Sequence, residues 1–194
     1  MDLALATFLI LAVIVSSVAL AIGIPFALGM LAYDVVQSRK PAVASTAAPN
    51  ADTVESHIAI KRGVARAFVV VGAAFWSLAA FSEYRLAGSD ASEATLMALV
   101  PLAASLATLV IGWYWERVAS ALLAAGALAA LAAGVVYGFT PQVWAIVTFA
   151  LIGPMATASI LFWAARSEQE AYERATALSP QLAFAFNARS GLGR

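Results

Sequence analysis

The chain has 194 residues, of which 63% are hydrophobic and only 11% are charged. Soluble domains carry roughly 25% charged residues, so this composition excludes a water-soluble core and favours an integral membrane protein. The formal net charge is zero, which provides no attraction to nucleic acid, and the absence of cysteine excludes disulfides, iron–sulfur clusters and thiolate metal sites.

The first apolar segment, residues 3–33, predicts a transmembrane helix within residues 1–36. At about 1.5 Å per residue, a helix of this length exceeds the roughly 30 Å hydrocarbon core of a bilayer. Pro25 lies inside the segment and removes one backbone hydrogen bond, so we expect a kinked or tilted helix. Residues 37–60 are rich in Ala, Ser, Thr, Pro and Asn and show no apolar periodicity, which predicts a flexible cytoplasmic linker.

Four further apolar stretches follow the linker, and each is close to the approximately 20 residues that a bilayer requires. They are residues 63–82, 94–115, 118–138 and 142–165. The connections between them are short, which places consecutive helices antiparallel to each other. The sequence therefore predicts an all-α polytopic membrane protein with five transmembrane helices, namely one kinked N-terminal helix and an up-down four-helix bundle over residues 61–166. Residues 167–194 are predicted to form a cytoplasmic tail.

Basic residues are distributed unevenly between the two predicted sides of the membrane. Of the 11 Lys and Arg residues, ten fall on the side shared by the linker, the 116–117 turn and the tail, and only Arg85 falls on the other. The ten are Arg39, Lys40, Lys61, Arg62, Arg66, Arg117, Arg166, Arg174, Arg189 and Arg194. Such an excess marks the cytoplasmic side. We expect a multi-pass protein of the bacterial cytoplasmic membrane, with its N-terminus outside and its C-terminus in the cytoplasm.

Small residues form a regular stripe in the fourth predicted span. Gly126, Ala130, Gly134 and Gly138 recur every four residues and therefore share one face of a helix. Small residues at this spacing let two helix backbones approach closely in lipid. The stripe predicts helix packing, either inside the bundle, which we favour, or against another subunit.

Two prolines interrupt the later spans. Pro101 lies early in the third span and Pro154 lies midway through the fifth. A proline in a membrane helix leaves a carbonyl that another group must satisfy, and Ser105, Thr157 and Ser159 are candidates for that role. The prolines predict kinks made for packing, and a broken helix that lines a ligand cavity is the alternative.

A compact polar motif, Trp113-Tyr114-Trp115-Glu116-Arg117, ends the third span. Trp113 and Trp115 are placed as interfacial anchors, and Glu116 with Arg117 could form a charged pair. Glu116 could serve as a proton or cation site, but its position in a turn within reach of water favours an interfacial cap.

Apart from Arg66, which lies within the first turn of the span at 63–82, Asp, Glu, Lys, Arg and His are absent between the span ends of the four-helix block, and the only histidine, His57, lies outside the predicted spans. Such residues mark ion paths and proton relays in membranes. Their absence argues against a proton-coupled transporter and against an enzyme with a buried acid–base pair. We expect no catalytic residues, no metal site and no bound cofactor.

The tail carries apolar residues without a core of its own. Glu170 and Arg174 are spaced for a helical ion pair. After them Leu182, Phe184 and Phe186 alternate with smaller residues. These side chains either lie in the lipid interface or contact a partner.

Between residues 60 and 166, the chain resembles a family of small, uncharacterised four-helix bacterial membrane proteins known as a domain of unknown function. The resemblance rests on Lys61 and Arg62, Phe81, Pro101, Trp113-x-Trp115-Glu116, Gly153-Pro154 and Leu161-Phe162. It implies a four-helix bundle and no particular activity. The first helix, the linker and the tail lie outside it, as an addition that would suit a subunit of a larger assembly.

Two functions are consistent with this sequence. The first is a structural or accessory subunit of a larger membrane complex, with membrane lipids and other membrane-protein subunits as partners. It rests on the small-residue stripe, the absence of charge in the spans and the added terminal segments. The alternative is a small transporter or binding protein for a neutral or lipophilic molecule, and it rests on Pro101 and Pro154.

Overall fold

The computed structural model describes the backbone of residues 3–39, 51–86 and 88–190. Over these ranges the chain is helical apart from short turns and contains no strand. The elements are α1 (Leu3–Arg39), α2 (Ala51–Leu86), α3 (Ala91–Tyr114), α4 (Glu116–Val136), α5 (Pro141–Val147), the π-helical segment η1 (Thr148–Ile152) and α6 (Gly153–Ser190). Among the described residues, five helices are long and apolar enough to cross a membrane, which confirms the predicted all-α fold.

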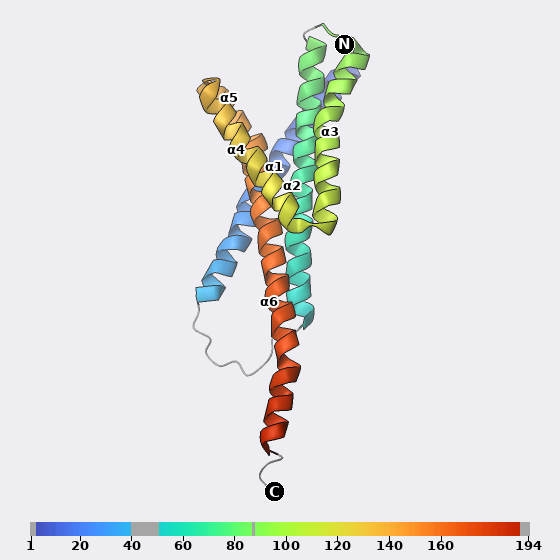
Figure 1. Ribbon diagram of the computed structural model, residues 1–194. Helices are drawn as coiled ribbons and strands as arrows, with labels where there is room; N and C mark the ends of the chain where they lie inside the picture. The colour runs from blue at the N-terminus through green and yellow to red at the C-terminus, as the bar shows by residue number, and fades with distance from the viewer. Residues whose placement is uncertain (1–2, 40–50, 87, 191–194) are drawn as a thin grey trace.

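The five candidate spans differ in length. α3 and α4 have 24 and 21 residues, or about 36 and 32 Å, close to the thickness of a hydrocarbon core. The fifth span is a single unit, Pro141–Ala177, made of α5, η1 and the first part of α6. α2 and α6 are much longer than a bilayer needs, and both extend past the α3–α4 turn toward the C-terminal end of the molecule (Figure 1).

α2, α3, α4 and the continuous unit of α5, η1 and α6 run alternately up and down, as predicted (Figure 1). They form two hairpins, one of α2 with α3 and the other of α4 with α5, η1 and α6. The hairpins meet where α2 packs on α6, and they spread apart toward the end of the molecule that carries the N-terminus (Figure 1). The shared core lies at the crossing and includes Phe68, Leu123, Leu161 and Phe162.

α1 crosses the bundle obliquely and packs on α2 and α6 (Figure 1). It continues through Pro25, which is exposed, so the proline does not end the helix. Leu20 and Ala27 are buried. A Cβ added to Gly23, between them, would lie 3.2 Å from the Phe68 ring, so this glycine allows close approach to α2.

The predicted linker is wrong at both of its ends. α1 continues to Arg39, and α2 begins at Ala51, so residues 51–60 are helical, while residues 40–50 lie outside the described part of the chain. Ile58 begins a stripe of buried positions that recur every three or four residues, as one helix face requires. The stripe comprises Ile58, Lys61, Ala65, Phe68, Val69, Ala73 and Ser77. The polar residues before Ile58 conceal the start of this stripe in the sequence.

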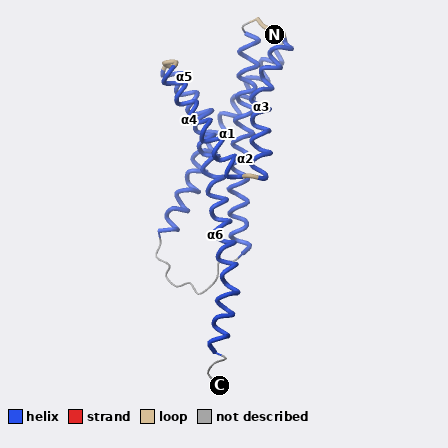
Figure 2. The backbone as a smooth tube through the Cα atoms, viewed as in Figure 1, coloured by secondary structure: helices blue, strands red, loops and turns tan. Residues whose placement is uncertain are grey.

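The predicted tail is a continuation of α6, which remains helical to Ser190 (Figure 2). Leu182, Phe184 and Phe186 lie in this helical part, and their side chains lie outside the described residues. Their alternation has a different meaning in a helix than in an extended segment. Positions 182 and 186 share a face because they are four residues apart, and position 184 lies on the opposite one.

The small-residue stripe of α4 packs inside the bundle. A Cβ on Gly126 would collide with Cε of Met155, and one on Gly134 would lie 2.6 Å from the ring of Trp144. Ala130 is half-buried between them. Gly138 has a different role, because it has a φ of +61° and open space around it, and so it supplies the left-handed turn that ends α4.

Candidate functional site

The α3–α4 connection is a single residue, Trp115. Its backbone N–H donates to the carbonyl of Ile111 at 2.6 Å, and its own carbonyl accepts from Val118 and Ala119 at 3.0 Å. These bonds satisfy groups that helix ends otherwise leave without partners. Because α4 begins at once, Glu116 is held on the inner side of the turn, beside α2.

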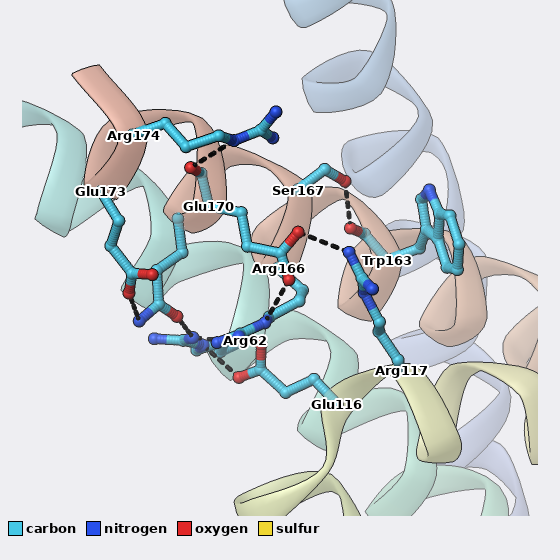
Figure 3. A network of polar contacts seen from close by, with 10 residues as sticks. Arg62, Glu116, Arg117, Trp163, Arg166, Ser167, Glu170, Glu173 and Arg174 are labelled. Carbon is cyan, nitrogen blue, oxygen red and sulfur yellow. Dashed lines mark hydrogen bonds and ion pairs between the residues drawn. The ribbon is translucent and has the colours of Figure 1, made fainter. Parts of the chain in front are cut away.

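Glu116 is a buried partner of Arg62. Its side chain is only 9% exposed, and Nη2 of Arg62 donates to its Oε2 at 3.1 Å while Nε contacts Oε1. This overturns the interpretation of Glu116 as a water-exposed cap. It also excludes the predicted pair between Glu116 and Arg117, because the turn directs these neighbours toward different helices (Figure 3).

Glu170 of α6 forms ion pairs with two arginines. Arg117 pairs with one carboxylate oxygen, and Nε of Arg166 donates to the other at 2.9 Å (Figure 3). The expected Glu170–Arg174 ion pair does not form, because Nε of Arg174 donates to the backbone carbonyl of Glu170 instead, at 3.0 Å.

Lys61 completes this set of contacts. Its side chain is 1% exposed and pairs with Glu168, and the neighbouring Arg62 also donates to Gln169. We call this set the polar network; it comprises Lys61, Arg62, Glu116, Arg117, Arg166, Glu168, Gln169 and Glu170. Only Glu116 and Arg117 were predicted as site residues. The members on α2 and α6 could have been found from their position within a turn of the predicted span ends.

Two arginines, Arg66 beside the polar network and Arg117 within it, lie against tryptophan rings. The guanidinium carbon of Arg66 is 4.5 Å from the centre of the Trp113 ring, and that of Arg117 is 5.8 Å from the centre of Trp163. Trp113 and Trp115 are 68% and 65% exposed. Such exposed rings fit their predicted place as interfacial anchors.

A hydroxyl pair joins α4 to α6 within the bundle. Ser120 Oγ donates to the carbonyl of Ser159 at 2.9 Å, and Ser159 Oγ donates to the carbonyl of Ser120 at the same distance. Both residues are buried. The pair holds the two helices in register. It also uses the hydroxyl of Ser159, which was one of the groups expected to satisfy a carbonyl near a proline.

The carbonyl freed by Pro154 is satisfied by an indole. In a regular helix the carbonyl of Ala150 would accept a bond from the N–H of residue 154, which proline lacks. Nε1 of Trp76 on α2 donates to this carbonyl at 2.9 Å. The π-helical segment η1 ends just before the proline, where the Gly153 N–H bonds to the carbonyl of Thr148. The sequence predicted a kink at Pro154, and the structure shows a π-helical segment directly before it.

Pro101 and Pro154 line the same apolar cavity. It has a volume of about 190 Å³ and lies between the two hairpins, where Phe68, Trp76 and Met155 also contribute to its wall. Pro101 does not interrupt α3. The prolines therefore face one shared space, although they are 53 residues apart in the chain.

No family model matches the chain, and no curated protein or solved structure matches it. The resemblance drawn from residues 60–166 to a family of small bacterial membrane proteins therefore stays a prediction. Function must be argued from the contacts described above.

Proposed function

We propose that this protein is a structural or accessory subunit of a larger integral membrane complex. The observation that carries this proposal is the course of α6. α2 and α6 run in opposite directions and are joined by the Lys61–Glu168 pair. α2 begins at Ala51, ten residues before Lys61. Because the helices are antiparallel, this start lies beside the residue of α6 about ten positions after Glu168, which is residue 178. Beyond it, residues 179–190 continue as helix past the end of α2 (Figure 1).

A helix that leaves its own bundle needs a partner. Residues 179–190 extend a helix that is already formed and incur no nucleation cost, but tertiary packing supplies most helical stability in proteins, and these residues lie past the end of α2, their neighbour in the bundle. Residues 171 and 173–177, just before this stretch, are already exposed. Leu182 and Phe186 then give one face of the projecting end two large apolar positions. These properties suit a helix that docks on another subunit.

We place the protein in the bacterial cytoplasmic membrane, with its N-terminus outside and its C-terminus in the cytoplasm. The support is the positive-inside distribution of ten of the 11 basic residues. Arg62, Arg66, Arg117 and Arg166 gather at the end that carries the α3–α4 turn, and Arg85 lies at the opposite end, in the last turn of α2. In this placement the projecting end of α6 lies in the cytoplasm.

The subunit proposal is tested by native electrophoresis. The full chain is extracted with a mild detergent from the cells that make it, and co-migrating proteins are identified by mass spectrometry. We expect a defined complex that the double variant Leu182→Gln/Phe186→Gln dissolves. The matched control, Phe184→Gln, changes the opposite face and should leave the complex intact. A lone monomer for the unmodified chain would overturn the proposal.

A second function, the binding of a small neutral or lipophilic molecule, is favoured by the apolar cavity. Its wall carries Pro101 and Pro154, and its 190 Å³ suit a small apolar molecule or a segment of an acyl chain. We expect a neutral alkyl diazirine to photolabel the cavity wall. Ala104→Trp, in the wall, should block labelling, whereas the exposed Ala103→Trp should not. Equal labelling of both variants would exclude a ligand in this cavity.

A further inference from the structure

The turn between α3 and α4 borders a polar hollow of about 420 Å³, which is separate from the apolar cavity. Three arginines from three helices line it: Arg62, Arg117 and Arg166. The aromatic run 113–115 and the carboxylates Glu116 and Glu170 complete most of its wall. The hollow brings cations from distant parts of the sequence to one place (Figure 3).

The cations of this hollow outnumber its carboxylates. Glu116 is engaged by Arg62, and Glu170 is shared between Arg117 and Arg166. Arg66 lies next to the hollow on the ring of Trp113, and no carboxylate pairs with it within the described residues. Arg117 is 58% exposed, and only one of its nitrogens contacts Glu170. A guanidinium has five N–H donors in a planar fork, so Arg117 retains donors for an anion.

The surroundings of the hollow indicate what kind of anion it receives. Trp113, Tyr114 and Trp115 are all at least 65% exposed, and exposed aromatic rings at a span end mark the depth of lipid headgroups. Exposed apolar side chains lead away from the hollow along both helices, with Val110 on α3 and Leu122 on α4. A molecule with a phosphate at one end and acyl chains at the other matches this arrangement. Basic pockets between helices on the cytoplasmic side bind anionic lipid headgroups.

We propose that this hollow binds a phosphate group, and that an anionic phospholipid supplies it, with Arg117 and Arg166 as the principal ligands. The phosphate competes with Glu170 for these two arginines. The proposal depends on placing the α3–α4 turn at the membrane surface, and it is independent of the subunit role. A monomeric protein could hold the lipid equally well.

Native mass spectrometry of the full chain in nonionic detergent tests the site. The probes are phosphatidylglycerol and phosphatidylcholine with identical acyl chains. We expect phosphatidylglycerol to bind about tenfold more tightly. Both lipids carry the same phosphate, but the choline of phosphatidylcholine places a positive charge beside the arginines and cancels the charge of the headgroup. Arg117→Gln should abolish that preference. Arg85→Gln, at the opposite end, makes the same change of charge and should leave the preference intact. Equal binding of the two lipids to the unmodified chain would overturn the proposal.

A second variant separates a lipid site from a purely structural ion pair. Glu170→Gln removes the carboxylate that competes for the arginines, so it should increase binding of phosphatidylglycerol about threefold, although it breaks the Arg117–Glu170 pair as Arg117→Gln does. If both variants reduced binding alike, the arginines would act only as structural partners and the proposal would fail. This variant also decides the matter if Arg117→Gln does not fold.

Soluble glycerol 1-phosphate distinguishes the two sources of phosphate. If it does not displace phosphatidylglycerol at millimolar concentration, the acyl chains contribute to binding and the ligand is the lipid. If it displaces the lipid completely, the site recognises phosphate alone and the lipid assignment is overturned.

Discussion

The two ends of the helical bundle are built in different ways. At the end with the α3–α4 turn, α2, α4 and α6 are joined by the polar network, and Lys61 and Glu116 are buried within it. Toward the other end the two hairpins spread apart, and an apolar cavity lies between them (Figure 1). Ion pairs and the serine pair join the helices at one end, while the other is held by van der Waals packing and by the hydrogen bond from Trp76 to the carbonyl of Ala150.

This difference has a physical basis. Lipid tails are as apolar as leucine, so apolar helices gain little from association by the hydrophobic effect within a membrane. Association must come from close packing or from polar contacts. In the proposed placement the α3–α4 turn lies at the depth of water and headgroups, where ionisable side chains can be kept. If this explanation is correct, substitutions at the two ends should differ in their effect on stability.

The largest effect is expected for Glu116→Ala. It leaves Arg62 without its carboxylate in a largely buried site and should lower the free energy of unfolding by about 3 kcal/mol. SDS titration in mixed micelles measures this change. Glu83 is an exposed carboxylate at the end where the hairpins spread apart, and Glu83→Ala should change the free energy of unfolding by less than about 0.5 kcal/mol. Equal effects would show that the polar network does not distinguish the two ends.

Gly134→Ala tests the packing of α4 against α5 at the end where the hairpins spread apart. The added Cβ would lie 2.6 Å from the ring of Trp144, so the ring must move, and we expect a loss of about 2 kcal/mol in the same titration. Gly63→Ala is the matched control, because nothing lies within 4 Å of its added Cβ. That variant should gain up to about 1 kcal/mol from better helix propensity. If Gly134→Ala left the free energy of unfolding unchanged, the contact between Gly134 and the ring of Trp144 would not be tightly packed.

Trp76→Phe removes the donor to the carbonyl of Ala150 and should cost about 1.5 kcal/mol. Pro154→Ala restores a backbone N–H that can bond to the same carbonyl. In the Pro154→Ala background, Trp76→Phe should therefore cost clearly less, and a double-mutant cycle measures the difference. If the effects of the two substitutions on the free energy of unfolding were strictly additive, the N–H of residue 154 would not replace Trp76 as the donor to this carbonyl.

Ser159→Ala should have the smallest effect, a loss of about 1 kcal/mol, because hydrogen bonds between membrane helices are modest. The control is Ser105→Ala, which lines the apolar cavity on α3. Thermal unfolding in detergent should rank Ser159→Ala below Ser105→Ala in stability. The reverse order would show that the serine pair does not hold α4 to α6.

Much of the fold could be predicted from the sequence, because span length and hydropathy are local properties. The predicted spans at 94–115 and 118–138 agree with the structure to within three residues, whereas the second span begins nine residues before position 63 and the fifth continues twelve residues past position 165. The small-residue stripe at Gly126 and Gly134 was also predicted. The start of α2 was missed because polar residues precede Ile58. In the tail the sequence indicated helix only through the spacing of Glu170 and Arg174, and the continuation of α6 to Ser190 was missed because the composition of the tail resembles that of a soluble segment.

The candidate sites were predicted less well. Glu116 was identified, but its partner Arg62 is 54 residues away in the chain, and the spacing between them carries no signal of contact. The donor to the carbonyl near Pro154 was sought among nearby hydroxyl groups and proved to be Trp76, on a different helix. Both errors have one cause: a local pattern does not show which helix faces which.

An all-helical chain with five segments able to span a membrane, and with ten of its 11 basic residues predicted on one side, follows from the amino-acid sequence. Hydrophobic length and charge distribution are sufficient for that, because the bilayer acts on each segment separately. The burial of Glu116 against Arg62, the cavity shared by Pro101 and Pro154, and the hollow lined by three arginines became visible in the folded molecule alone. These contacts depend on the crossing of helices distant in the chain, which is set by the packing of all their side chains together.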